Sequence, residues 1–309
     1  MRRRHRATTK MTPPNMGMAH DAIVACPFFR CRFMTDSFDL SRYFSRIGYD
    51  GPVEPTLDVL RRLHLLHPQA IPFENLNPLT GARVALDLPS IADKVLAHRR
   101  GGYCFELNKL FYAALTAIGF RVTPMIARVR WMQPPEVATA HTHMLLRIDL
   151  DGAAWLADIG FGSATLTAPL RFVRDERQLT PHGAFRVVAA PVDGEFDMQI
   201  ETPDGWQTTY RFQPKRVEWI DYDAANWFTS TYPESIFLHN LIACRVLPDG
   251  RAALRNTTLT IRDAAGVGRT VTFDDAAAWG ACLRDTIGID TTGFDLDALF
   301  ARLAAPAAA

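Results

Sequence analysis

The chain has 309 residues, of which 48% are hydrophobic and 22% charged, and its formal net charge is +1. This length supports a sizeable core, and the balanced charge gives no reason to expect nucleic acid or a membrane surface as a partner. Five scattered cysteines form no disulfide framework, and the sequence contains no CxxC pair, HExxH segment or membrane-length apolar run. We expect a cytoplasmic protein without a metal, either a monomer or a homodimer.

Residues 1–36 are predicted to form a disordered leader or an upstream extension. They begin with a basic run at 2–6 and continue with scattered threonine, proline and methionine. A signal or transit peptide is the alternative, but the apolar run at 22–29 is broken by Pro27 and lacks a clear small-residue cleavage site. If they are an upstream extension, we expect the natural chain to start at Met34.

Residues 37–118 are predicted to form a helical domain, because apolar side chains recur there at helical spacing. Thr56 is a candidate N-cap for one helix, and Pro68 is expected to end that helix. The segment 71–76 is predicted to be a compact turn. The expected helices are 39–47, 57–67, 89–98 and 104–118.

From Phe120 the apolar period changes to two, which is typical of strands. Residues 119–220 are therefore predicted to form a small antiparallel barrel or sandwich, and 221–309 a domain that mixes helix and strand. The strands expected in the first are 121–130, 142–150, 153–159, 184–191, 196–201 and 205–212. The elements expected in the second are a helical turn at 223–229, strands at 237–246 and 252–262, and helices at 274–286 and 296–303.

The segment 99–108, RRGGYCFELN, combines two glycines, a cysteine and the start of an apolar helix. Gly101 and Gly102 allow a tight bend and leave room beside the backbone for a ligand. Cys104 then falls in the first turn of a buried helix, where unpaired N–H groups and the positive end of the helix dipole favour a thiolate. A lone cysteine in this place is more often a small core residue, so its interpretation depends on residues further along the chain.

Asp151-Gly152 is a strong two-residue turn signal between two apolar strands. Such a turn pairs residues whose numbers sum to 303, which puts His143 and Asp158 on one face as diagonal neighbours. A carboxylate inside an apolar strand needs a partner, and an imidazolium is a suitable one. His141 shares the face but lies one pair further from Asp158, so we rank it second.

A cysteine at a helix start, a histidine and a carboxylate supply the nucleophile, base and orienting group of thiol chemistry. Cys104, His143 and Asp158 are the candidates. Their order, on a helix followed by antiparallel strands, is that of papain-like and transglutaminase-like enzymes. This chemistry predicts acyl transfer through a thioester on Cys104 and leaves the acyl donor and the acceptor open.

Several motifs together resemble those of the bacterial arylamine N-acetyltransferases. They lie in the family's order, with 39 positions from Cys104 to His143 and 15 from His143 to Asp158, and they span nearly everything after the leader. The motifs are IPFENL at 71–76, RGGYCFELN at 100–108, THMLL at 142–146, WLADIGFG at 155–162 and STYPESIF at 230–237.

The resemblance implies an α+β fold with an N-terminal helical bundle, a central antiparallel β-barrel and a C-terminal α/β lid, arranged around a cysteine-protease-like core. It implies ping-pong transfer of acetyl from acetyl-CoA to arylamines, arylhydrazines or N-hydroxyarylamines, without a metal. Cys104 would be the nucleophile, His143 the general base and acid, and Asp158 the orienting group. The residues implied to line the acyl and arylamine pocket are Phe73, Val129 and Phe161. The residues implied to contact coenzyme A are Thr142, Gly160, Ser235 and Phe237.

Two other enzyme classes fit the same three residues. One is a transglutaminase-like or cysteine-protease-like hydrolase, which predicts an open groove and a glutamine or peptide substrate. The other is an amide synthase of the same family, which predicts no use of acetyl-CoA. A non-catalytic ligand-binding relative is disfavoured by the intact set of nucleophile, base and carboxylate.

Overall fold

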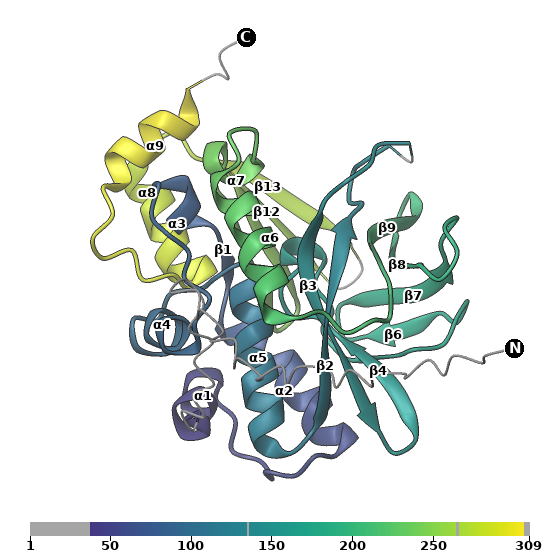
Figure 1. Ribbon diagram of the computed structural model, residues 1–309. Coiled ribbons are helices and arrows are strands. Elements are labelled where there is room, and N and C mark those ends of the chain that lie inside the picture. The colour runs from purple at the N-terminus through teal and green to yellow at the C-terminus, as the bar shows by residue number, and fades with distance from the viewer. Residues whose placement is uncertain (1–37, 135, 264–265, 306–309) are drawn as a thin grey trace, which may run out of the picture. The chain divides into compact units, whose positions relative to one another are not determined.

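The computed structural model describes residues 38–134, 136–263 and 266–305. The predicted leader at 1–36 and the expected start at Met34 lie outside the described residues. The described part of the chain combines helices, an eight-stranded antiparallel sheet and a five-stranded sheet (Figure 1). This architecture confirms the predicted α+β class.

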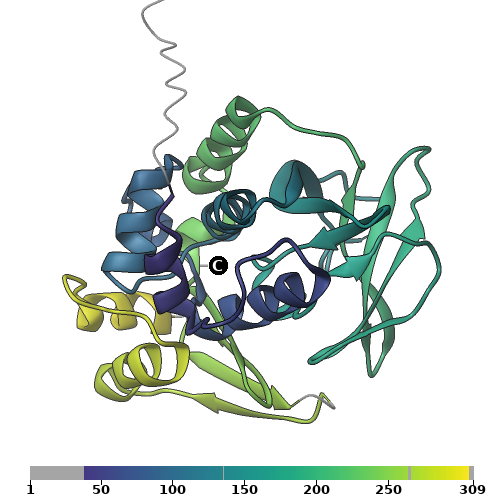
Figure 2. The ribbon, with the colours of Figure 1, turned by 90° about the horizontal axis from the view of Figure 1, so that it is seen from below.

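The N-terminal part of the described chain is mainly helical and is organised around helix α5. This helix is buried along most of its length and packs against α1, α4, β2 and β3; it is seen nearly end-on in Figure 2. Thr56 caps α2 as predicted, accepting the backbone N–H of Val59. The helices are α1 (Leu40–Ile47), α2 (Leu57–Ala70), α3 (Leu76–Leu79), α4 (Leu88–Ala92), the π-helical η1 (Asp93–Ala97) and α5 (Cys104–Ile118).

Eight strands form an antiparallel sheet in the order β5-β4-β3-β2-β9-β8-β7-β6. Its two edge strands meet, because the side-chain amide of Gln178 in β6 bonds to both the backbone N–H and the C=O of Arg171 in β5. The sheet therefore curls into a nearly closed barrel. The strands are β2 (Arg121–Val129), β3 (His141–Leu150), β4 (Ala153–Ala157), β5 (Leu170–Arg171), β6 (Gln178–Thr180), β7 (Gly183–Ala189), β8 (Phe196–Thr202) and β9 (Gly205–Phe212).

The five-stranded sheet contains strands from the N-terminal and the C-terminal parts of the described chain, because the early strand β1 pairs with β10. Phe73 of β1 lies opposite Cys244 of β10, so the segment expected to be a turn is an edge strand. The strands are β1 (Phe73–Glu74), β10 (Ile242–Leu247), β11 (Gly250–Arg255), β12 (Thr258–Asp263) and β13 (Gly268–Thr272). The helices of this part are α6 (Trp219–Thr231), α7 (Ile236–His239), α8 (Ala276–Ala281), the π-helical η3 (Cys282–Ile287) and α9 (Leu296–Ala304). A 3-10 turn, η2 (Gly162–Ala164), follows β4.

Two predicted strands of the C-terminal part were wrong in their extent. The strand expected at 237–246 begins as helix α7, because the Ser235 hydroxyl accepts the N–H of Phe237 and caps a helical turn. The strand expected at 252–262 is two strands, β11 and β12. They are joined by a tight turn in which Asn256 has a φ of 53°, a left-handed conformation that asparagine tolerates.

Two other boundaries also differ from the prediction. Helix α2 continues through Pro68 to Ala70. Pro68 lacks a backbone N–H, so the helix loses one hydrogen bond there, and it ends two residues later. Strand β4 ends at Ala157 rather than at Ile159, because the backbone beyond it is bonded by side chains.

Buried apolar side chains gather in three clusters: around α5, inside the barrel, and between the five-stranded sheet and helices α8 and α9. The first cluster includes Cys104 itself, together with residues of α1, α2, β3 and β10. The nucleophile candidate is thus placed by the largest of these cores. The division into domains at 37–118, 119–220 and 221–309 stays a prediction.

Candidate active site

Cys104 is the first residue of α5, and only 5% of its surface is exposed. Its Sγ atom lies 3.5 Å from the carbonyl oxygen of Thr142 in β3. The first backbone N–H groups of a helix have no helical acceptor, and the helix dipole is positive at this end. A negative charge on the sulfur is therefore stabilised at this position.

The two glycines before the cysteine are required by close packing rather than by their φ angles. Neither glycine has a positive φ. A Cβ atom on Gly101 would clash with the carbonyl oxygen of Pro72, and one on Gly102 would lie 2.9 Å from Cβ of Glu106. Gly102 also forms a parallel bridge with Phe73. The segment leading into β1 therefore lies directly against the turn that carries the cysteine.

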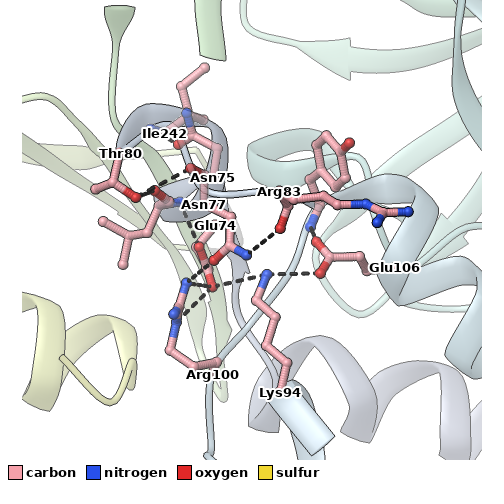
Figure 3. Close-up of polar contacts among 11 residues, drawn as sticks. Glu74, Asn75, Asn77, Thr80, Arg83, Lys94, Arg100, Glu106 and Ile242 are labelled. Atoms are coloured by element: carbon pink, nitrogen blue, oxygen red, sulfur yellow. Dashed lines mark hydrogen bonds and ion pairs between the residues drawn. The ribbon is translucent and has the colours of Figure 1, made fainter. Parts of the chain in front are cut away.

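A buried ionic network holds this turn in place (Figure 3). The Nζ atom of Lys94 lies 2.8 Å from Oε1 of Glu106 and 3.6 Å from Oε1 of Glu74. Arg100 donates to the same Glu74 oxygen, with Nη2 at 2.7 Å. The second Glu106 oxygen accepts the backbone N–H of Tyr103 at 3.0 Å, and so caps the start of α5.

Lys94 stabilises two carboxylates that are almost without contact with water. Burial raises the pKa of Glu106; Lys94 opposes this shift, and the charge of Glu74 adds to it. Burial also acts to raise the pKa of Glu74, but Lys94 and Arg100 together hold it below its usual value. The cap of the cysteine helix thus depends on a single ammonium group shared between two acids.

The β3–β4 hairpin brings His143 and Asp158 together. Leu146 lies opposite Ala157, which confirms the register predicted from the turn. Asp158 is the first residue after β4, and its Oδ2 atom lies 2.7 Å from Nε2 of His143. Both side chains are buried, with 1% and 2% of their surfaces exposed.

The His143 ring has one nitrogen on Asp158, so Nδ1 remains for the hydrogen bond that the ring shares with Cys104. Burial by itself lowers the pKa of His143. The charge and hydrogen bond of Asp158, together with Cys104, raise it well above its ordinary value. Burial acts to raise the pKa of Asp158, but His143, Asn108 and the Gly160 N–H hold it below its ordinary value. At neutral pH the pair is therefore an imidazolium and a carboxylate.

The backbone that follows β4 is fixed by side chains instead of a strand ladder. Four consecutive N–H groups donate to side-chain atoms: Asp158 to His64 Nε2, Ile159 to Asn108 Oδ1, Gly160 to Asp158 Oδ1 and Phe161 to Thr165 Oγ1. The Asn108 amide also donates to Asp158 Oδ1 at 3.0 Å and to the Met144 carbonyl at 2.7 Å. Asn108 lies one turn after Cys104, so it fastens the cysteine helix to both strands of the hairpin.

The comparisons with known proteins agree with this geometry. The sequence profile of the family described as N-acetyltransferase matches residues 56–296. The arylamine N-acetyltransferase of Escherichia coli (strain K12) is 37% identical over 271 residues, which cover 86% of this chain and 95% of that protein. The chain belongs to the arylamine N-acetyltransferase family. It is therefore an acyltransferase that acetylates arylamines.

Two further relatives show similarity of the same kind. The arylamine N-acetyltransferase / N-hydroxyarylamine O-acetyltransferase of Salmonella typhimurium is 41% identical over 211 residues, which cover 68% of this chain and 74% of that protein. The solved structure of the Mycobacterium marinum arylamine N-acetyltransferase in complex with CoA is 37% identical, with a TM-score of 0.81. That similarity covers 86% of this chain and 98% of that chain.

Aromatic rings lie around the histidine of this N-acetyltransferase. The ring centroids of Phe161 and Tyr210 are 5.0 Å and 4.9 Å from that of His143. A second aromatic pair, Phe73 and Phe237, has its centroids 6.2 Å apart. The sequence indicated Phe161, Phe73 and Phe237, but it did not indicate Tyr210.

Three other residues expected to bind substrate or coenzyme A lie beside Cys104 or beside Tyr210. Gly160 is packed against Cys104, since an added Cβ would lie 2.9 Å from the Cα atom of that residue. Thr142 presents its carbonyl oxygen to the same sulfur. Val129 ends β2 and pairs with Tyr210 of β9.

Ser235 and His141 have local surroundings of a different kind. The Ser235 hydroxyl donates to the carbonyl of Thr229 and caps α7, which carries Phe237. His141 is exposed, in contrast to the buried His143 two positions later. The lower rank given to His141 therefore agrees with its position.

Sequence reasoning missed four residues that support the site: His64, Lys94, Asn108 and Tyr210. Asn108 stood inside a quoted motif, so its position relative to Cys104 was a usable signal. His64 stands on the apolar face of α2, and a histidine there is an unusual core residue. Lys94 and Tyr210 carried no local signal, because their roles depend on contacts with distant segments.

Within the described ranges, no group of three His, Cys, Asp or Glu side chains is placed to hold a metal ion. Across the same ranges, no helix is long and apolar enough to cross a membrane. The cysteines described there form no disulfide: Cys104, Cys244 and Cys282.

Proposed function

We propose that this enzyme transfers acetyl from acetyl-CoA to arylamines, arylhydrazines or N-hydroxyarylamines through an acetyl-Cys104 intermediate. The observation that carries the proposal is that Cys104, at the start of α5, His143 and Asp158 lie buried in a row. The donor is supported by the Mycobacterium marinum relative, which was solved with CoA. The Salmonella typhimurium relative, an N-hydroxyarylamine O-acetyltransferase, supports the last acceptor class.

In the first half-reaction the Cys104 thiolate attacks the thioester carbonyl of acetyl-CoA. A new S–C bond forms, and the carbonyl oxygen takes the negative charge, which backbone N–H groups at the start of α5 stabilise. The bond between carbonyl carbon and CoA sulfur then breaks. CoA leaves as a thiol, because the departing sulfur takes the Nδ1 proton of the His143 imidazolium.

In the second half-reaction the acceptor nitrogen, or the hydroxyl oxygen of an N-hydroxyarylamine, attacks the acetyl carbon on Cys104. His143, now neutral, removes the proton from the attacking atom, and the Cys104 thiolate leaves. This step restores the thiolate–imidazolium pair. Asp158 keeps Nε2 protonated throughout, so that Nδ1 is the nitrogen that gains and loses the proton.

The binding roles are part of the same proposal. Phe73, Val129 and Phe161 line the acyl and arylamine pocket, where apolar walls exclude water and so favour transfer over hydrolysis. Thr142, Gly160, Ser235 and Phe237 contact coenzyme A. The position of Gly160 against Cys104 supports this assignment, because a side chain there would clash with the nucleophile's backbone.

The test is steady-state kinetics with acetyl-CoA and 4-methoxyaniline as the two varied substrates. We expect acetylated amine, stoichiometric free CoA thiol and parallel double-reciprocal lines, and we expect Cys104→Ala to abolish all product while remaining folded by circular dichroism. Peptide or glutamine-amide hydrolysis without use of acetyl-CoA would favour the hydrolase. Absence of CoA release with intact protein would favour the amide synthase.

A further inference from the structure

His64 lies on α2 and is completely buried behind the catalytic hairpin. Its Nε2 atom accepts the backbone N–H of Asp158 at a distance of 3.1 Å. The ring packs edge-on against Phe111 of α5, with centroids 5.7 Å apart. The imidazole therefore lies between the cysteine helix and the residue that orients His143.

The hydrogen bond from the Asp158 N–H to His64 is the first one that fixes the backbone beyond the end of β4. Ala157 is the last residue of β4, and the N–H of Asp158 has no strand partner. A buried N–H without an acceptor is costly, so the peptide would rotate to find one. That rotation would swing the Asp158 carboxylate, because the side chain moves with its own backbone.

The protonation state of His64 fits this role. Burial lowers the pKa of His64 to about 4, although the nearby charge of Asp158 acts to raise it. His64 is therefore neutral at working pH, with Nε2 available as the acceptor and the proton on Nδ1. A neutral ring does not compete with His143 for the charge of Asp158.

Core stability alone does not account for a histidine at this position. Its Nδ1 atom is buried and has no hydrogen-bond partner among the described residues. An unpaired buried polar atom costs stability, whereas leucine would fill similar space without one. The contact with Asp158 is what distinguishes His64 from an ordinary core residue.

We propose that His64 is a positioning residue of the acetyl-transfer reaction, which holds the Asp158 peptide so that its carboxylate meets Nε2 of His143. This inference rests on the proposed function of the triad, which is Cys104, His143 and Asp158. The row of interacting residues then has four members, in the order Cys104, His143, Asp158 and the neutral His64 on α2.

Three variants of the full chain separate positioning from packing. His64→Leu removes the acceptor and keeps an apolar side chain. His64→Gln keeps an acceptor oxygen at nearly the position of Nε2. His67→Leu is the matched control, because His67 lies one turn away on the same helix, is equally buried, and bonds to Tyr43 rather than to Asp158.

The first readout is the single-turnover rate of Cys104 acetylation by acetyl-CoA. We expect His64→Leu to lower it by about 10- to 100-fold, as loss of an orienting partner does at other sites, and His64→Gln to recover most of the loss. His67→Leu should leave the rate per folded enzyme unchanged. Equal losses in His64→Leu and His67→Leu would overturn the proposal, as would a wild-type rate in His64→Leu.

The second readout is the titration of the His143 ring by NMR, which needs no substrate. Asp158, Cys104 and the Tyr210 phenol surround this ring, and of these Asp158 is the group that His64 holds. We expect the titration midpoint to fall in His64→Leu and to stay in place in His67→Leu and His64→Gln. An unchanged midpoint in His64→Leu would contradict the proposal. Failure of the wild type to acetylate Cys104 would instead contradict the proposed function, while this titration would still report on His64.

Discussion

Nε2 of His143 lies 2.7 Å from Oδ2 of Asp158, in a place where neither side chain touches bulk water. A buried carboxylate next to a buried imidazole makes the protonated ring the stable form. In the proposed mechanism, the proton that CoA takes when it leaves is therefore already on His143 before acetyl-CoA arrives.

Replacing Asp158 with asparagine tests the value of that charge. The amide has nearly the same shape, but it does not stabilise an imidazolium, so the pKa of His143 should fall from about 10 to below its ordinary value. We expect the acetylation rate to drop by about 10²- to 10⁴-fold at pH 7. Stopped-flow detection of CoA thiol measures it. A loss smaller than threefold would show that the carboxylate charge is dispensable.

Asn108→Ala should reduce stability and activity together. The amide makes three hydrogen bonds to the hairpin, and its loss leaves the Ile159 N–H and the Met144 carbonyl without these partners. We expect a loss of about 1 to 3 kcal/mol in the free energy of unfolding and a slower acetylation step. Asn256→Ala, which removes bonds to Leu241 and Asn240 and none to the β3–β4 hairpin, is the control. It should lose stability while keeping its rate per folded molecule.

Lys94→Met should be strongly destabilising, because it leaves Glu74 and Glu106 buried next to each other with one cation fewer. Removing one partner of a buried ionic group costs about 3 to 5 kcal/mol. Adding Glu106→Gln should recover much of this loss, since the amide oxygen still accepts the Tyr103 N–H but carries no charge. Urea denaturation of the single and double variants gives the coupling free energy between positions 94 and 106. Strictly additive losses would count against the shared-ammonium network.

Stability should fall in mild acid because of His67. Burial holds the pKa of His67 well below its ordinary value of 6.5, so the unfolded chain binds a proton that the folded chain does not. The stabilisation is complete above pH 6.5 and decreases as the pH falls below it, by about 1.4 kcal/mol per pH unit. From pH 7 to pH 5, His67→Leu should therefore lose about 2 kcal/mol less than the wild type.

The contact between His143 and Asp158 was predictable because it is local. A two-residue turn fixes the register of a hairpin, and side-chain alternation then fixes the face. The position of Cys104 at a helix start followed in the same way from apolar periodicity. The contact between the helix and the hairpin, by contrast, was inferred from chemistry and from the family resemblance.

Apart from those of Asn108, the supporting contacts were not predictable, because they join segments far apart in sequence. His64 is 94 positions before Asp158, and no pattern on α2 indicates that this face meets the end of β4. The pairing of Phe73 with Cys244 is equally remote. Local chemistry misled in one place: Ser235 caps a helical turn inside an apolar run that alternation assigned to a strand.

The most direct measurement is the intact mass of the protein after mixing with acetyl-CoA in the absence of any acceptor. We predict one added acetyl group, about 42 Da from the chemistry of acyl transfer through a thioester, located by peptide mapping on Cys104 and removed when an arylamine is added. Cys104→Ser should give no such species on the same timescale. Wild-type protein that transfers acetyl to an arylamine while Cys104 stays unmodified would contradict the thioester mechanism.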